Sequence, residues 1–144
     1  MIRDKIVIII VILAAPSLSG QSVFELAGNW HGNGKITTTW CEQDTLHFDF
    51  TISTDDEITG RIGDAVILGG VTEKDETSGD VSYIITIKLK GNLIECQDIR
   101  RSKMVLLVRR NDNLMTGNFY TEGALFGRKP DGAIIGTSLA LYYR

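Results

Sequence analysis

Apolar and polar side chains alternate one by one along much of this chain, and that alternation limits its possible folds more than any other feature. One stretch carries apolar residues at every second position: Leu46, Phe48, Phe50 and Ile52. A later stretch repeats the pattern: Tyr83, Ile85, Ile87 and Leu89. Because successive side chains of a β-strand point to opposite faces, each stretch is predicted to be a strand with one buried face.

Turn-forming residues separate these stretches from others of similar character. The predicted strands span residues 27–40, 46–53, 57–63, 65–68, 82–89, 92–98, 103–110, 114–126 and 133–143. The predicted connections are turns at 55–56, 91–92, 100–102, 111–113 and 130–132, with a polar loop at 73–80. The chain has fifteen glycines and only two prolines, a balance that favours tight hairpin turns over a flexible linker.

A series of about eight to ten short strands defines the expected fold class. Sequential hairpins in a chain of this length favour an all-β, antiparallel up-and-down meander. Closing the meander into a barrel removes its exposed sheet edges, so a closed barrel is the first prediction. A β-sandwich is the alternative.

The N-terminal segment has the composition of a secretory signal. Basic residues precede an apolar run over 6–15, and a small-x-small cleavage site follows at 17–19. The run is shorter than the roughly 20 apolar residues of a membrane-spanning helix. We therefore expect residues 1–19 to be a signal peptide that is removed, and residues 20–144 to form a single β-barrel domain. The mature protein is expected to be secreted or periplasmic, with no stable membrane anchor.

Charge and cysteine content fit that location. The formal net charge is −3, and it becomes −4 once the signal is removed. A mildly acidic chain lacks the excess of Lys and Arg that neutralises phosphates, so no nucleic-acid partner is expected. In an oxidising compartment, Cys41 and Cys96 are predicted to form a disulfide. These cysteines, His31 and His47 lack metal-ligand spacing, so no metal and no cofactor are expected.

Catalytic residues are scarce in the sequence. His31 and His47 are the only histidines, and no Gly-x-Ser-x-Gly elbow accompanies them. His47 falls on the polar face of its predicted strand. His31 directly follows Trp30 and is expected to face away from that ring. We therefore predict no catalytic residues and a non-catalytic protein.

Basic residues gather at two of the predicted turns. Arg100, Arg101 and Lys103 form one cluster, and Arg109 and Arg110 form the next. Such clusters could hold an anionic group. Consecutive strand residues point to opposite faces, however, so only part of each cluster is expected to converge.

The predicted ligand-binding residues are the large aromatic side chains of the buried strand faces: Trp30, Phe48, Phe50, Tyr83 and Phe119. In a small barrel, such residues either fill the interior or line a cavity for an apolar or amphipathic ligand, and the sequence leaves both open. Tyr142 and Tyr143 occupy opposite faces of the last predicted strand, so one of them points inward. The strand register decides which.

The first predicted strand opens in a way that resembles calycin-type barrels, the group of lipocalins, fatty-acid-binding proteins and avidins. The resemblance lies in Gly28-x-Trp30, within Phe-Glu-Leu-Ala-Gly-Asn-Trp at residues 24–30. It implies that Trp30 packs across one end of the barrel and that Gly28 lets the chain bend into the first strand. Motifs specific to each family are missing: the lipocalin Thr-Asp-Tyr and C-terminal helix, the helix pair of fatty-acid-binding proteins, and the later avidin tryptophans. No ligand residue is therefore carried over.

A second resemblance concerns bacterial periplasmic inhibitors of secreted metalloproteases, which open with Leu-x-Gly-x-Trp, as Leu26, Gly28 and Trp30 do here. Those inhibitors insert their N-terminal segment into the protease cleft; residues 20–25 here have no obvious match to it.

The leading prediction is a secreted or periplasmic non-catalytic binding protein for a small hydrophobic or amphipathic ligand. The alternative is a protein-interaction module, such as a protease inhibitor of the envelope.

Overall fold

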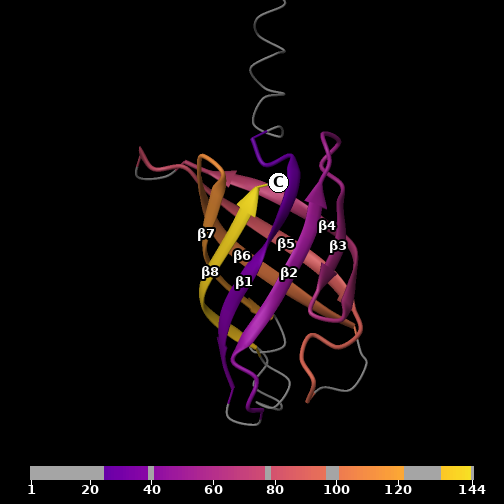
Figure 1. The fold of residues 1–144 in the computed structure, drawn as a ribbon. Helices are drawn as coiled ribbons and strands as arrows, with labels where there is room; N and C mark the ends of the chain where they lie inside the picture. The colour runs from indigo at the N-terminus through magenta and orange to yellow at the C-terminus, as the bar shows by residue number, and fades with distance from the viewer. Residues whose placement is uncertain (1–24, 39–40, 77–78, 97–100, 122–133, 144) are drawn as a thin grey trace, which may run out of the picture.

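The computed structural model describes residues 25–38, 41–76, 79–96, 101–121 and 134–143 (Figure 1). Within them lie eight strands: β1 (Gly28–Thr37), β2 (Thr45–Ile52), β3 (Ile58–Ile62), β4 (Ala65–Asp75), β5 (Ser82–Lys90), β6 (Arg101–Asn111), β7 (Leu114–Thr121) and β8 (Ile135–Tyr143). Each strand pairs antiparallel with the next, and β8 pairs with β1 to close the barrel. The predicted up-and-down barrel is thus confirmed over the alternative sandwich. Among the described residues, no helix is long and apolar enough to cross a lipid bilayer.

The alternating stretches of the sequence form the inner face of the barrel. In β2 the apolar residues at positions 46, 48, 50 and 52 are buried, and their polar neighbours are exposed or half-buried. β5 follows the same pattern from Tyr83 to Leu89. The register places Trp30 of β1 opposite Phe50 of β2, so inward-facing residues of neighbouring strands meet. The two-residue alternation of apolar and polar side chains therefore predicts which residues face inward and which face outward.

β4 is longer than the sequence predicts. The expected strand ended at Leu68, but pairing with β5 continues to Asp75. A β-bulge between Ile67 and Gly69 interrupts the alternation, and pairing with β5 resumes at Gly69, opposite Lys88. The first residues of the predicted polar loop at 73–80 are therefore strand residues. Backbone pairing with β5 sustains this part of the strand although its side chains are mostly polar.

Two predictions around the β5–β6 connection are wrong. The described part of the predicted strand 92–98 consists of turns and bends up to Cys96. Leu93 and Ile94 are consecutive and both buried, at 2% and 3% exposure, which a one-sided strand does not allow. The predicted turn at 100–102 is also wrong in its described part, because Arg101 and Ser102 already belong to β6. The predicted turn at 130–132 lies outside the described residues.

Large aromatic rings fill the middle of the barrel. The rings of Phe48 and Phe119 meet edge to face, with centroids 5.0 Å apart and planes at 77°. Phe119 lies over two glycines, and a Cβ at Gly34 or Gly136 would overlap its ring. Such edge-to-face pairs contribute about 1 kcal/mol beyond the burial of their area. The two glycines therefore make room for the Phe119 ring.

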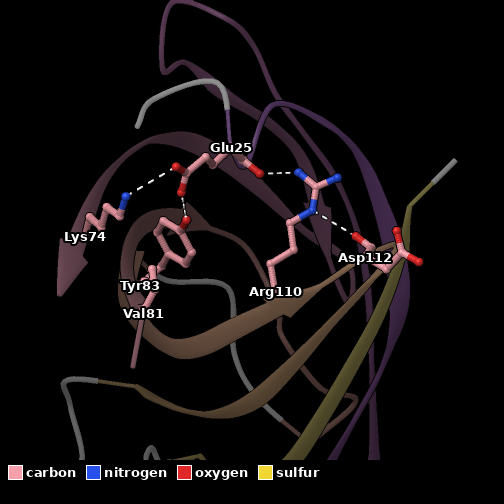
Figure 2. Close-up of a pocket in the computed structure, with 6 residues that line it drawn as sticks. All are labelled: Glu25, Lys74, Val81, Tyr83, Arg110 and Asp112. Carbon is pink, nitrogen blue, oxygen red and sulfur yellow. Dashed lines mark hydrogen bonds and ion pairs between the residues drawn. The ribbon is translucent and has the colours of Figure 1, made fainter. Parts of the chain in front are cut away.

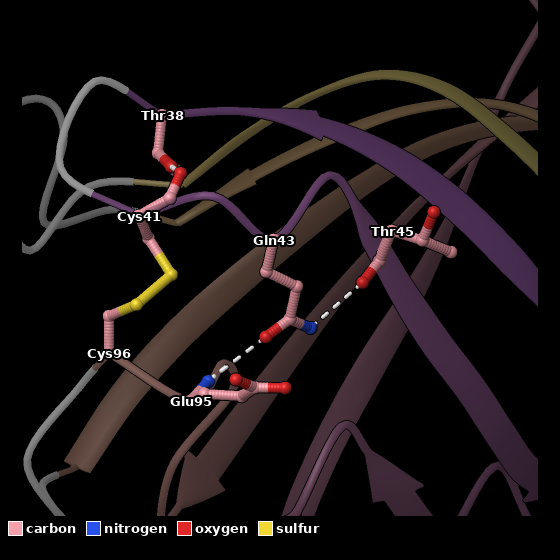
Figure 3. The surroundings of a disulfide bond; sticks show 6 residues. All are labelled: Thr38, Cys41, Gln43, Thr45, Glu95 and Cys96. Carbon is pink, nitrogen blue, oxygen red and sulfur yellow. Dashed lines mark hydrogen bonds between the residues drawn. A yellow bond between two sulfur atoms is a disulfide. The ribbon is translucent and has the colours of Figure 1, made fainter.

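One end of the barrel is fastened by the disulfide between Cys41 and Cys96, whose Cα atoms are 5.9 Å apart (Figure 3). This region is called the disulfide end below. The Gln43 side chain accepts a 3.0 Å hydrogen bond from the Glu95 amide and donates one of 2.8 Å to the Thr45 carbonyl. The predicted disulfide is confirmed, and it is consistent with an oxidising environment outside the cytoplasm.

Candidate functional site

A pocket with a volume of about 390 Å³ opens at the other end of the barrel, called the pocket end below (Figure 2). Its lining comes from four places in the chain: the turn before β1, the end of β4, the start of β5 with the residue before it, and the end of β6 with the turn that follows. The lining residues are Glu25, Lys74, Val81, Tyr83, Arg110 and Asp112. Four of them carry charges, two of each sign, around one exposed aliphatic side chain.

Strand pairing and turn geometry bring these residues together. Lys74 and Tyr83 are direct partners in the β4–β5 ladder, so both point to the inner side at the barrel rim. Asp112 has a φ of 62°, the left-handed conformation that a tight hairpin turn needs and that Asp tolerates. This turn returns the chain so that Arg110 and Asp112 stand on the same rim. The rim is thus assembled from β-hairpin ends.

Glu25 is the centre of a polar network in the pocket. Its carboxylate accepts hydrogen bonds from the Tyr83 hydroxyl and from Lys74 Nζ, the latter at 3.2 Å. Lys74 Nζ also lies 3.2 Å from a carboxylate oxygen of Glu76. These contacts fix the chain just before β1 to the ends of β4 and β5.

The network shifts the proton affinities of its members. The hydrogen bond from Tyr83 lowers the pKa of the Glu25 carboxyl below its ordinary value, against the opposing effect of burial. Burial, followed by the hydrogen bond to Glu25, raises the pKa of the Tyr83 phenol. Hydrogen bonds to Glu76 and Glu25 raise the pKa of Lys74. Near neutral pH, therefore, Glu25 is ionised, Lys74 is charged and Tyr83 keeps its proton.

Arg110 closes the rim from the opposite side. Its guanidinium lies 5.1 Å from the ring centroid of Trp30 and 5.3 Å from that of Tyr143, within cation–π distance of both. Arg110 Nε donates a 2.9 Å hydrogen bond to the Asp112 carbonyl, and Nη1 donates to the Glu25 carbonyl. Arg110 thereby joins the aromatic floor of the pocket to its charged rim.

Trp30 and Gly28 support this floor. Trp30 is fully buried, and its Nε1 donates a 2.9 Å hydrogen bond to the carbonyl of Leu26. The Tyr143 ring packs edge to face on it, with centroids 5.3 Å apart. Gly28 has a φ of 143°, and a Cβ there would overlap the Tyr143 ring. Glycine at this position thus allows both the backbone bend and the close approach of the ring.

The five predicted ligand-binding aromatics all lie on the inner face, with exposures of 0 to 4%. Tyr83 also lines the pocket, and Trp30 lies beneath Arg110. Phe48, Phe50 and Phe119 lie deeper in the core. Contact between these aromatics and a ligand stays a prediction. Of the last two tyrosines, Tyr143 is on the inner side with Trp30, while Tyr142 is outside beside His31.

The histidines lie away from the pocket. His31 faces outward opposite Asp49, as expected from its position after Trp30. His47 is exposed and forms a 3.1 Å hydrogen bond with the side chain of Asn33. Within the described part of the chain, no group of three or more His, Cys, Asp or Glu side chains could hold a metal ion.

Sequence reasoning missed most of the pocket. Glu25 lies in the segment that has no match to the protease inhibitors, and Lys74 lies in the predicted loop at 73–80. The sequence predicts only a turn at Asp112. Tyr83 is the one predicted ligand-binding residue that lines the pocket. Of the basic pair, Arg110 also reaches the pocket, while Arg109 faces outward toward Asp80, 3.7 Å away.

Comparisons with protein-family models, with curated proteins and with solved structures give no match to this chain. The closed, eight-stranded antiparallel barrel is compatible with a calycin-like fold. The functional argument therefore depends on the geometry of the chain itself.

Proposed function

We propose that the protein is a secreted or periplasmic, non-catalytic binding protein whose ligand is a small amphipathic molecule seated in the pocket at the pocket end. The observation that carries the proposal is the pocket itself. Its volume of about 390 Å³ suits a small molecule, because ligand pockets usually enclose 300 to 1,000 Å³ as a rough range. The eight-stranded barrel and Gly28-x-Trp30 further support a calycin-type binding protein.

The lining indicates the chemistry of the ligand. Lys74 and Arg110 offer positive groups, Glu25 and Asp112 offer carboxylates, and Val81, 41% exposed, offers an apolar contact. Because Lys74 already pairs with Glu25, a head group with a single charge can replace only one partner of that pair and leaves the other partner unmatched. A head group that bears both a cation and an anion matches both. The best ligand is thus a small zwitterion with a short apolar tail.

The packing of the aromatic rings favours a ligand at the rim over one deep inside the barrel. Phe48 and Phe119 contact each other and are at most 1% exposed. A ligand between them would have to separate the rings, and the close packing of the interior would be lost there. The pocket needs no such rearrangement.

Calorimetric titration with three eight-carbon probes tests the proposal. We expect α-aminooctanoate, a zwitterion, to bind saturably, and octanoate and octylamine to bind about tenfold more weakly, since each lacks one charged contact. Lys74→Met should weaken α-aminooctanoate binding, whereas Lys35→Met, on the exposed side of β1, should not. Absence of saturable binding by all three probes would remove the proposal.

A protein-interaction module is the second candidate, favoured by an uncharged row across the outer surface. Strand register aligns one residue from each of five consecutive strands: Val71, Thr86, Val105, Tyr120 and Ile135. Val105, in the middle of the row, is only 6% exposed. Val71 and Ile135 at the ends of the row are 56% and 53% exposed. Inhibition of purified secreted metalloproteases, lost on Val71→Lys, would support this candidate; no inhibition would count against an inhibitor role.

A further inference from the structure

Four cations lie together on the outer surface of β5 and β6. The register places Lys88 directly opposite Lys103 and Lys90 directly opposite Arg101. Residues two apart on a strand share a face, so the two pairs stand side by side on one surface. Of the basic cluster seen in the sequence, Arg101 and Lys103 therefore lie on the same face, and β5 contributes the other two cations.

The juxtaposition of Lys90 and Arg101 is unfavourable for the isolated barrel. Like charges directly opposite each other on neighbouring strands are destabilising. The chain as a whole is acidic, with a net charge of −3, so basic residues gather here against the overall balance. Among the described residues, no carboxylate forms an ion pair with Lys88, Lys90 or Arg101. These three cations therefore give the surface a local positive field that an external anion can neutralise.

Two exposed aliphatic residues of β4 border the cations. Val66 is directly opposite Lys90 and is 46% exposed. Leu68 lies at the bulge between Ile67 and Gly69 and is 50% exposed. Gly69 in turn is opposite Lys88. Apolar and basic side chains thus share one continuous part of the outer surface.

We propose that this surface, the basic face, binds membranes that contain anionic lipids. The basic face comprises Val66, Leu68, Lys88, Lys90, Arg101 and Lys103. A lipid surface supplies both complements at once: phosphates for the cations and an acyl boundary for the aliphatic side chains. A soluble polyanion complements only the cations, and leaves Val66 and Leu68 without a role.

The basic face is far from the pocket, so the two sites can act together. Tyr83 in the pocket and Lys90 are both on β5, seven residues or roughly 23 Å apart at the usual rise of a strand. Membrane contact through the basic face leaves the pocket end accessible. The inference stands independently of the pocket and of the ligand proposed for it.

Co-sedimentation of the mature protein with vesicles tests the proposal. One set of vesicles contains only phosphatidylcholine, and the other contains equal parts of phosphatidylcholine and phosphatidylglycerol. We expect binding to the anionic vesicles alone, weakening as salt is raised. Each basic residue near an anionic bilayer strengthens binding about 5-fold, so Lys88→Glu with Lys90→Glu should weaken it by at least ~25-fold. Leu68→Ser should weaken it about 3-fold.

Matched controls separate a surface contact from a folding defect. Lys35→Glu with Arg109→Glu changes the net charge equally at exposed sites outside the basic face and should retain most of the binding. The Lys88→Glu and Lys90→Glu variant places opposite charges across the strands, so its thermal stability should not fall. Equal binding by this variant and the wild type would overturn the proposal. So would dextran sulfate binding as strong as vesicle binding and insensitive to Leu68→Ser, which would identify a soluble polyanion as the partner.

Discussion

The two ends of the barrel are closed by different kinds of interaction. At the disulfide end, a covalent bond joins Cys41 to Cys96, and Leu93 and Ile94 are buried beside it. At the pocket end, the chain before β1 is held by hydrogen bonds and charges around Glu25 and Arg110. Polar contacts can exchange partners without unfolding, whereas a covalent crosslink cannot. One end of the barrel is therefore closed by a permanent crosslink, and the other by contacts that can rearrange.

The largest effect is expected from breaking the disulfide end. Replacing both cysteines, Cys41→Ser with Cys96→Ser, opens a loop with a sequence separation of 55 and should lower the free energy of unfolding by about 4 kcal/mol in the chain-entropy model. Urea denaturation of the variant and the wild type measures this. Binding of α-aminooctanoate at low temperature should persist, because the pocket is at the other end. Loss of binding in a still-folded variant would contradict the independence of the ends.

Removing the Arg110 guanidinium should have the next largest effect. Arg110→Met abolishes the contacts with Trp30 and Tyr143 and the hydrogen bonds to two carbonyls. The expected loss of unfolding free energy is about 2 kcal/mol. Arg109→Met is the matched control, since its exposed ion pair with Asp80 contributes less than ~0.5 kcal/mol. Equal effects of the two substitutions would show that the Arg110 contacts add nothing to stability.

The pH dependence of stability should come partly from the pocket end. The pKa of Glu25 is lowered in the folded protein, so its contribution is present above the ordinary value of 4.5 and is lost as the pH falls. The pKa of Tyr83 is raised, so its contribution is present below 10.0 and is lost as the pH rises above that value. Glu25→Gln should flatten the acid limb by less than ~1 kcal/mol, because partial solvent exposure screens the interaction. Urea denaturation across pH checks this, and an unchanged acid limb would contradict it.

The smallest effect is expected at Glu76. Lys74 pairs with both Glu76 and Glu25, and the Glu76 carboxylate is the more exposed of the two, at 66% against 40%. Glu76→Gln leaves the pair with Glu25, so the thermal midpoint should not change measurably. A large decrease in the thermal midpoint would show that Glu76, and not Glu25, is the more important partner of Lys74.

The sequence predicts the barrel far better than it predicts the pocket. Alternation in β2 and β5 assigns inner and outer faces because a strand has a period of two. The disulfide is predicted from the presence of two cysteines and from the expected secretion signal. The pocket depends on contacts across long separations, such as Glu25 with Tyr83, 58 positions apart. No local pattern marks such a pair, since its geometry comes from register and barrel closure.

The β4 bulge also explains why the sequence-based strand was too short. Gly69 and Gly70 interrupt the apolar alternation, which is the normal signal for a strand end. The backbone nevertheless continues through the bulge, and it carries Lys74 to the rim opposite Tyr83. Because the bulge hides the second half of β4 from the sequence pattern, it also hides the position of Lys74 in the pocket.

The seam between β1 and β8 affects how the molecule reaches this structure. Trp30 pairs with Tyr143, which joins the first described strand to the last, whereas the other seven pairings join strands adjacent in sequence. Hairpins can form locally, but the seam must wait until the chain has brought both strands together, a slow step for non-local contacts. Gly28 and Arg110 contact the ring of Tyr143 at this seam. The pocket floor is therefore completed only with barrel closure, so the ligand binding proposed for this pocket would report that closure.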